Sequence, residues 1–587
     1  MAAGSLSASI GPAGRSTCSP WSASPSGWET SGSSRGWPTV TVEGFFSFPC
    51  FLMLVFCGIP LFALETAIGQ FCSQGSINVW RAVPIMQGVG FSMVMVSMLV
   101  AVYYNVIIAY SLYYLFASFQ SPLPWAACSG CSSASTGVFV LASSCNVSGV
   151  LVANHTCPPG QSPSEHYWDH VVLQRSSGLD DTGPVVWHLA VCLGLSSVLV
   201  AGILSRGIKS SGKVVYFTAT FPYVVILILL VRGVTLEGAG EGLKFFIGSK
   251  SNWSKLAEVK VWNDAAAQTF FTLSIGMGGL FTLSSYSEFH TNIFLDSVVV
   301  VFVSYGTSVL AGVAIFSILG HMAHVYKRPI EKVVKEGFGL AFIVYPEALT
   351  QLPISALWCV LFFVMLIVIS VDSQFTLIEV IVTCVSDSFP EVLETKRALI
   401  TVAICALVFL LALPCITQAG IYWITLLDMF SSNWLLLVLA LAEILGFIYI
   451  YGANPLIKDI EMMVGNRSYI FWLWWKACWH FFSPGILVVI LLWSILTFVP
   501  LSYGTVPFPA WGLALGWCIV AAVLVWIPAV AAYKWARAEG SFLKRLRTTC
   551  SPSERWHPYL DGNRGERYSA ESCSRRKAET KNITQQK

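Results

Sequence analysis

Two adjacent polar residues, Asp372 and Ser373, stand inside the strongly apolar stretch LFFVMLIVISVDSQF (361–375). A carboxylate in such a stretch is costly unless it has a partner, so it marks a candidate functional site. A hard cation such as sodium takes oxygen ligands, which a carboxylate, a hydroxyl and nearby backbone carbonyls can provide. This pattern predicts a cation site. The alternative is an aspartate paired with a lysine or with backbone amides.

A second candidate lies between Asn263 and Phe289, a stretch that is apolar enough to cross a membrane but carries Gly276, Gly278 and Gly279 at its middle. Glycine costs roughly 1 kcal/mol in a helix interior. An opened backbone at membrane depth is tolerated only where it is buried in protein or lines a polar cavity. A helix broken at this depth predicts a site for a small polar solute or ion. The alternative is a flexible kink packed against small residues.

Both candidates require a membrane-embedded scaffold, and the composition provides one. Hydrophobic residues make up 55% of the chain and charged residues 11%, which is typical of an integral membrane protein. No zinc-finger, phosphate-loop or dinucleotide motif is present, so we expect neither a nucleic-acid partner nor an enzyme. Counting ~20 apolar residues per crossing predicts about eleven spans: 46–68, 89–118, 185–204, 214–232, 264–286, 296–322, 355–385, 398–416, 432–451, 470–498 and 511–533.

The long loop 119–184, between the second and third expected spans, fixes the orientation. It contains four cysteines, and the resulting expectation is a disulfide bond that involves Cys128 and Cys131, with the pairing left open. It also contains the glycosylation sequons at Asn146 and Asn154, and a further sequon at Asn252 falls on the same side. Disulfides and glycans both belong to the extracellular side. The basic residues that follow the last span place the C-terminus in the cytoplasm.

Several strings resemble the neurotransmitter:sodium symporter family, solute carrier family six. They are GIPLFALETAIGQF (58–71), YYNVIIAYSLYY (103–114), LPW (123–125), GKVVYFTATFPY (212–223), LSSYSEF (283–289), VDSQF (371–375) and TQAGIYW (417–423). Segments 164–178, 231–242 and 557–568 match one amino-acid-transporting branch of that family particularly well. The resemblance covers most of the chain, from Gly44 to Tyr568.

The resemblance implies an all-α, LeuT-type inverted-repeat transporter of twelve helices, in which the first and sixth are unwound around the substrate. The stretch 263–289 resembles the sixth helix. Tyr104 resembles the tyrosine that binds the substrate carboxylate, although a membrane tyrosine is more often an interfacial anchor. Phe271 and Ser274 resemble the wall and the floor of the side-chain pocket, and ordinary packing is the alternative for both.

The same resemblance assigns two sodium sites. Asp372, Ser373 and the carbonyl of Ile369 resemble one of them. Thr272 stands in the other site where a serine is more usual, and Ser304 stands where the family has a ligating asparagine.

The chloride cage of the family is expected at Gln268, Thr272, Ser304, Ser308 and Cys50. The neutral side chain of Ser308, where a chloride-independent relative would have a carboxylate, favours chloride dependence. Cys50 replaces a tyrosine and removes a strong hydrogen-bond donor from the cage. These departures weaken the assignment of both ion sites.

Three acids are expected to be buried in the membrane: Asp372, Glu65 and Asp428. Asp428 aligns with the acidic outer gate of the family, and Glu65 aligns with a buried glutamate of the second helix. The gate partner of the family is an arginine on the first helix, and both acids need that helix nearby, because an unpaired buried carboxylate is costly.

Residues 1–44 are Ser/Gly/Pro-rich and contain no candidate span, so the first helix of the family is missing and eleven spans remain instead of twelve. When the third base of each codon is read with the first two bases of the next, Trp28–Gly44 permits LGNVWKFPWLAYRNGGG, which resembles that helix. Trp28-Glu29 forces the glycine in this string, and Trp37-Pro38 forces an alanine. We interpret residues 1–44 as a frameshifted first helix, and a disordered arm is the alternative.

The expected organisation is an aberrant N-terminus (1–44), a transporter domain (45–540) and a cytoplasmic tail (541–587). The shifted codon at Gly27 excludes the aspartate that monoamine transporters carry there and points to amino acids. We expect sodium-coupled symport of neutral amino acids, with cationic ones as a further class and chloride as co-ion, across the plasma membrane. The alternative is a transport-inactive membrane protein that lacks the first helix. A channel or a membrane enzyme would need a pore loop or an acid/His cluster, and neither is seen.

Overall fold

The computed structural model describes residues 47–126, 162–205, 208–247, 259–327, 330, 338–388, 390–496, 502–503 and 506–568. Several predictions concern residues outside these ranges and are not tested by the structure. They are the aberrant N-terminus, the disulfide at Cys128 and Cys131, and the glycosylation sequons at Asn146, Asn154 and Asn252.

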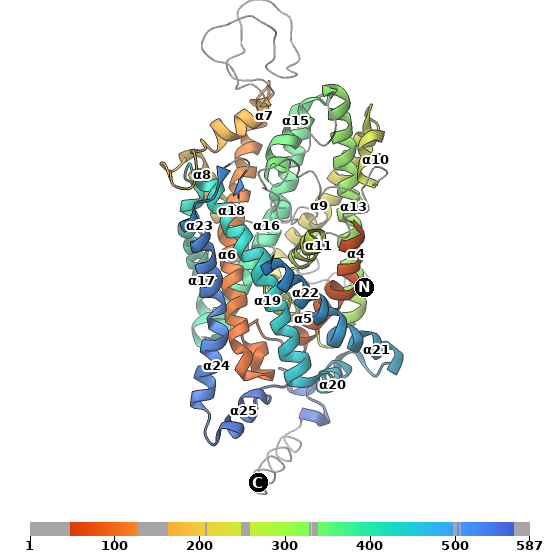
Figure 1. Cartoon of the computed structure of the whole chain (residues 1–587), viewed down its shortest axis with the longest axis vertical. Coiled ribbons are helices and arrows are strands. Elements are labelled where there is room, and N and C mark those ends of the chain that lie inside the picture. Colours follow the sequence, from red (N-terminus) through yellow and green to blue (C-terminus); the bar gives the residue numbers. More distant parts are fainter. Residues whose placement is uncertain are drawn as a thin grey trace, which may run out of the picture.

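The described chain is helical apart from one short hairpin (Figure 1). Its strands β1 (Ser502–Tyr503) and β2 (Val506–Pro507) pair antiparallel, with Ser502 opposite Pro507. Many helices continue into short π-helical segments. The helices are α4 (Ser47–Met53), η2 (Leu54–Gly58), α5 (Ile59–Cys72), η3 (Asn78–Ala82), η4 (Pro84–Met86), α6 (Gln87–Ala117), α7 (Pro163–His166), η5 (Tyr167–Val172), α8 (Trp187–Ser205), α9 (Ile208–Val234), α10 (Ala239–Ile247), α11 (Val259–Thr272), α12 (Gly279–Ser284), α13 (Ile293–Tyr326), η7 (Leu340–Val344), α15 (Tyr345–Thr350), α16 (Ser355–Ser388), α17 (Pro390–Ala412), η8 (Leu413–Ile416), α18 (Gly420–Asp428), η9 (Met429–Trp434), α19 (Leu435–Ile444), η10 (Leu445–Gly452), α20 (Ala453–Val464), α21 (Tyr469–Ala477), η11 (Cys478–Phe482), α22 (Ser483–Leu496), α23 (Ala510–Leu524), α24 (Trp526–Arg537), α25 (Phe542–Cys550), η12 (Asp561–Asn563) and η13 (Glu566–Tyr568).

In the described part of the chain, nine helices are long and apolar enough to cross a membrane. The pair Thr220–Val234 and Ala239–Ile247, bent by 113°, makes a tenth if it counts as one span. The expected span 264–286 is not among them, because α11 and α12 are separated by a non-helical segment and neither is long enough alone. Eleven continuous spans are therefore not observed.

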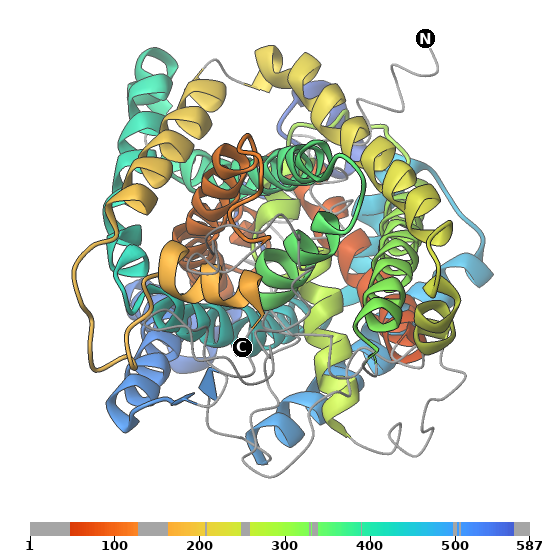
Figure 2. The ribbon, with the colours of Figure 1, turned by 90° about the horizontal axis from the view of Figure 1, so that it is seen from above.

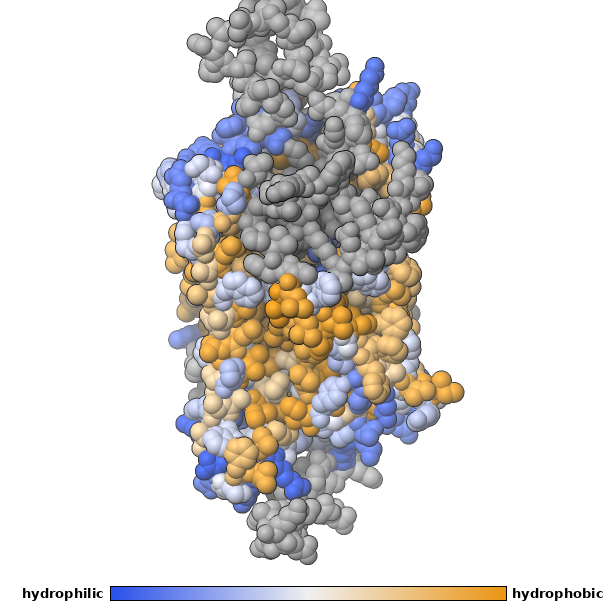
Figure 3. Space-filling model, viewed as in Figure 1, coloured by the Kyte–Doolittle hydropathy of each residue, from blue (hydrophilic) through white to orange (hydrophobic). Residues whose placement is uncertain are grey.

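The surface agrees with a membrane position. On the face shown in Figure 3, hydrophobic residues form a broad band across the middle, with hydrophilic residues toward both ends. Many large apolar side chains are exposed, among them Leu496 at 79%, Val191 at 70% and Val198 at 69%. In water such a surface would be an aggregation hazard, whereas lipid covers it without cost.

The helix α6 lies inside the bundle, and Figure 2 shows it enclosed by helices from later parts of the chain. Its neighbour α16 contacts it along its length, and Gln374 Nε2 donates to the Ala101 carbonyl at 3.1 Å. Tyr114 stacks on Phe363 with ring centroids 5.0 Å apart. These contacts place the middle of α6 against the Asp372 region of α16.

A proline in the first turn of α5, Pro60, is accompanied by side-chain hydrogen bonds from later elements of the chain. Pro60 has no N–H group, so it cannot donate a helical hydrogen bond to the Phe56 carbonyl four residues earlier. That carbonyl accepts a hydrogen bond from Ser483 Oγ of α22 at 2.8 Å, and Trp479 Nε1 donates to the Pro60 carbonyl at 2.9 Å. Side chains from η11 and from α22 thus satisfy backbone groups that lipid could not.

We expect Ser483→Ala to lower the free energy of unfolding by about 1 kcal/mol, because the Phe56 carbonyl loses its side-chain donor. Thermal unfolding of the purified protein in detergent measures this change. Ser205→Ala is the matched control, since the Ser205 hydroxyl donates to the Gly202 carbonyl of its own helix. Equal losses of stability in both variants would contradict this account.

Candidate functional site

The broken helix predicted from the glycines is present. α11 ends at Thr272 and α12 begins at Gly279. Between them Ser274, Gly276 and Gly278 all have left-handed backbone angles, with φ of 55°, 78° and 76°. Glycine adopts this region without steric cost, which explains why two of the three positions are glycines.

Three side chains from other elements bond to the opened backbone. Glu65 Oε1 of α5 accepts from the Gly276 N–H at 2.9 Å. Ser97 Oγ of α6 donates to the Met277 carbonyl at 2.6 Å, and Ser76 Oγ donates to the Gly278 carbonyl at 2.8 Å. Residues 275–279 are all buried, so these bonds replace the ones a continuous helix would have made.

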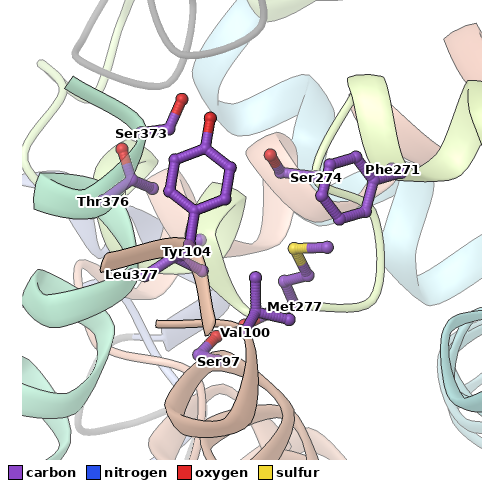
Figure 4. Close-up of a pocket in the computed structure, with 10 residues that line it drawn as sticks. Ser97, Val100, Tyr104, Phe271, Ser274, Met277, Ser373, Thr376 and Leu377 are labelled. Carbon is purple, nitrogen blue, oxygen red and sulfur yellow. Dashed lines mark hydrogen bonds between the residues drawn. The ribbon is translucent and has the colours of Figure 1, made fainter. Parts of the chain in front are cut away.

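A cavity lies beside this opened backbone (Figure 4). Its hydroxyl groups come from α6, from α16 and from the broken helix, and its apolar walls come from the same elements. In the described part of the chain no residue that carries a charge at neutral pH lines it. The lining residues are Ser97, Val100, Tyr104, Phe271, Ser274, Met277, Gly279, Ser373, Thr376 and Leu377.

Four of the predicted site residues meet in this cavity: Tyr104, Phe271, Ser274 and Ser373. The Tyr104 side chain is 6% exposed, and its hydroxyl lies near the hydroxyls of Ser370 and Ser373. Figure 4 shows the Tyr104 ring beside Ser373 and Thr376, with Phe271 and Ser274 across from it. A tyrosine in this position is not an interfacial anchor.

The remaining residues of the predicted cation site share one turn of α16. Asp372 is buried, and the Ile369 carbonyl accepts from Ser373 Oγ at 3.3 Å. Ser373 thus connects this turn to the cavity.

The predicted chloride residues fall into two groups. On α11, Gln268 Nε2 donates to Thr272 Oγ1 at 3.4 Å. On α13, Ser308 Oγ donates to the Ser304 carbonyl at 3.0 Å. The helix α4, which carries Cys50, packs against α11 and also reaches α13, where Phe51 and Tyr305 have ring centroids 5.8 Å apart. Each pair is thus hydrogen-bonded within its own helix, and α4 contacts both helices.

The predicted gate residue Asp428 is fully buried at the end of α18. Ser432 Oγ donates to its Oδ1 at 3.3 Å, so the hydrogen bond of 2.8 Å between Tyr103 and Ser432 has the tyrosine as donor. The hydrogen bonds thus run from Tyr103 through Ser432 to Asp428, and Tyr103 is the residue before Tyr104 on α6.

The sequence-based count of three buried acids was wrong, because Asp264 of α11, Glu379 of α16 and Glu443 of α19 are also buried in expected spans. The Glu443 carboxyl interacts with Glu65, the residue that holds the Gly276 N–H. The signal was available, since Glu443 stands in the apolar string LLLVLALAEILGF (435–447).

Other contributors had no signal of their own. Ser97, Ser76 and Thr376 are single small polar residues in apolar or loop segments, and many such residues bond only to their own helix. Their role becomes visible only when the structure places them beside the opened backbone or the cavity.

Comparison with known proteins agrees with this architecture. A sequence model described as the sodium:neurotransmitter symporter family matches residues 41–538. A sodium- and chloride-dependent neutral and basic amino acid transporter B(0+) from Mus musculus is 52% identical over 543 residues, 89% of this chain and 85% of that protein. Its Homo sapiens counterpart is 51% identical over 547 residues, with the same coverage.

A more distant relative is the sodium- and chloride-dependent glycine transporter 2 of Xenopus laevis, which is 43% identical over 549 residues, 89% of this chain and 69% of that protein. The family expected from the sequence strings is therefore confirmed, and its members are transporters rather than enzymes. This chain belongs to the sodium:neurotransmitter symporter family.

Proposed function

We propose that this protein is a plasma-membrane symporter that couples the entry of amino acids to sodium, with chloride as a co-transported ion. The chain is about half identical to transporters described as sodium- and chloride-dependent and as carrying neutral and basic amino acids. The proposal extends that description to this chain.

One observation carries the proposal: the cavity beside the broken helix has hydroxyl groups but, among the described residues, no charged side chain. A free amino acid brings both an ammonium and a carboxylate, and each must keep its hydrogen bonds when it leaves water. Hydroxyls and the backbone groups of 273–278 meet part of this need. A sodium ion supplies the missing positive charge for the carboxylate, and this explains why substrate and ion would move together.

We assign the roles by position. The Tyr104 hydroxyl binds the substrate carboxylate, and Phe271 and Ser274 contact its side chain. Ile369, Asp372 and Ser373 bind one sodium ion, and Thr272 with Ser304 contributes to another. Gln268, Thr272, Ser304 and Ser308 hold chloride, with Cys50 as the weakest member. Asp428, with its Tyr103–Ser432 chain, serves as the outer gate.

Residues 1–44 bear on whether this chain transports as it is written. We propose that they are a frameshifted first helix, because the shifted codons of Trp28–Gly44 permit a string that resembles that helix. Sequencing the source transcript across codons 1–50 against genomic DNA tests the proposal.

The symport proposal is tested by uptake of labelled neutral and cationic amino acids into cells, with sodium or an inert organic cation outside. Both the chain as written and a version with the shifted frame restored should be compared at matched surface expression. Sodium-dependent uptake by either version supports symport, and replacing chloride with gluconate should reduce it. Background uptake by both versions would instead favour the transport-inactive alternative.

We expect Tyr104→Phe to raise the KM for amino acids at least about tenfold, because a hydrogen bond to a charged group contributes about 1.5–3 kcal/mol. The uptake assay measures this in whichever version transports. Tyr469→Phe removes the hydroxyl of a tyrosine that is 75% exposed and should leave the KM unchanged. An unchanged KM in Tyr104→Phe would remove this residue from the site.

We expect Asp372→Asn to raise the sodium concentration for half-maximal uptake about tenfold or more, since the ion loses its charged ligand. The matched control is Asp180→Asn, which removes a charge outside the membrane, where Asp180 accepts from Trp511 Nε1 at 2.6 Å. If both variants keep the normal sodium dependence, Asp372 is a structural aspartate paired within the protein.

A further inference from the structure

A second cavity lies where the C-terminal tail packs on the segment after α5, and it shares no lining residue with the substrate cavity. We call it the tail cavity. It is lined by Cys72, Gln74, Asn78, Arg81, Arg555, Trp556, His557, Tyr559 and Arg564, so the described lining has three arginines and a histidine but no carboxylate.

The walls of the tail cavity are held by specific contacts. The Ser553 N–H donates to the Arg81 carbonyl at 2.9 Å, which fastens the tail to η3. Trp556 is buried, with its ring centroid 5.2 Å from that of Phe71 and its Nε1 donating to the Tyr451 hydroxyl at 2.9 Å. The arginines therefore face a defined hollow.

Guanidinium groups lie close to one another in the tail cavity. Arg81 is partly buried on the loop, and its pKa is lowered by this burial and then by the charge of Arg555, while Asp387 and Cys72 act in the opposite sense. Asp387 is also engaged elsewhere, because its Oδ2 accepts from the Gly75 N–H at 2.9 Å. Arg564 Nε donates to the Pro558 carbonyl at 3.4 Å. Two guanidinium groups close enough to affect each other, with a third on the same hollow, favour an anion between them.

The surroundings indicate where such an anion would come from. The helix α25 contacts η4, which follows η3 and its Arg81 after a single residue. It is short and amphipathic: Phe542 is 65% and Leu543 75% exposed, beside Lys544, Arg545 and Arg547. A basic helix with exposed apolar side chains is typical of a membrane surface, where it attracts anionic lipids.

We propose that the tail cavity binds a phosphorylated headgroup, and that its source is an anionic lipid of the adjacent leaflet. Arginine guanidinium groups bind phosphate oxygens through paired hydrogen bonds, and Arg81, Arg555 and Arg564 stand around one hollow. Inorganic phosphate or a soluble inositol phosphate has the same chemistry, so the test must separate these sources from the lipid.

A bound headgroup would affect the broken helix through the segment that connects α5 and α6. Ser76 and Arg81 both lie in this segment, and Ser76 Oγ donates to the Gly278 carbonyl at 2.8 Å. A headgroup that fixes Arg81 would therefore hold the loop against the opened backbone, and the loop and tail would be stabilised together.

The test uses the full chain in phosphatidylcholine nanodiscs, with the thermal unfolding midpoint as readout and no requirement for transport. Phosphatidylinositol bisphosphate is added to one set and phosphatidylserine at equal total charge to another. Inositol trisphosphate or inorganic phosphate is added in solution to a third. We expect the midpoint to rise most with phosphatidylinositol bisphosphate. Arg81→Gln and Arg555→Gln should each weaken its apparent affinity about tenfold.

Arg467→Gln is the matched control, because Arg467 is an exposed arginine in the turn between α20 and α21, outside the tail cavity. It should keep the wild-type response. Arg555 is exposed, so its substitution tests the site even if Arg81→Gln fails to fold. An equal response to soluble phosphates would keep the anion site but overturn the lipid as its source. No response in the wild type, or equal losses in all three variants, would overturn the proposal.

Discussion

An opened stretch of backbone must be satisfied inside a membrane protein, and the rest of this structure depends on how that is done. Residues 273–278 interrupt a helix in a buried position, so their N–H and C=O groups cannot turn to water. Glu65, Ser97 and Ser76 bond to them from three separate elements. These bonds fix α5, α6 and the loop after α5 around the break, and the cavity forms where the break meets α6 and α16.

The cavity lining supplies hydrogen-bonding groups, whereas the charge that the substrate needs would come from ions. The described lining is neutral, with hydroxyls from α6, from α16 and from the broken helix. A permanent cation there would pair with substrate whether or not sodium was present, and it would remove the reason for coupling. The carboxyl group of Glu65 holds the Gly276 N–H at the break, and Glu443 interacts with it from α19.

Much of the fold and part of the site could be predicted from the sequence, and the failures have physical causes. The broken helix could be predicted because glycines in an apolar span are costly and need a reason. Tyr104, Phe271, Ser274 and Ser373 came from the family resemblance, and they do line one cavity. Ser97 could not be found, because α6 is apolar on nearly all sides and has no polar face that would reveal its orientation. Glu443 could have been found by the argument that selected Asp372.

The contact between Ser76 and Gly278 constrains how this protein can evolve. A methyl group at Gly278 would lie 2.4 Å from Ser76 Oγ, and the backbone angle of +76° disfavours any side chain there. Ser76 in turn cannot grow toward a carbonyl that it already holds. A substitution at either position alone would lower the stability of the protein. The two residues therefore constrain each other, and neither can be replaced in a single neutral step. The chemistry of the cavity can diversify at Phe271 or Thr376, while the break that creates the cavity stays as it is.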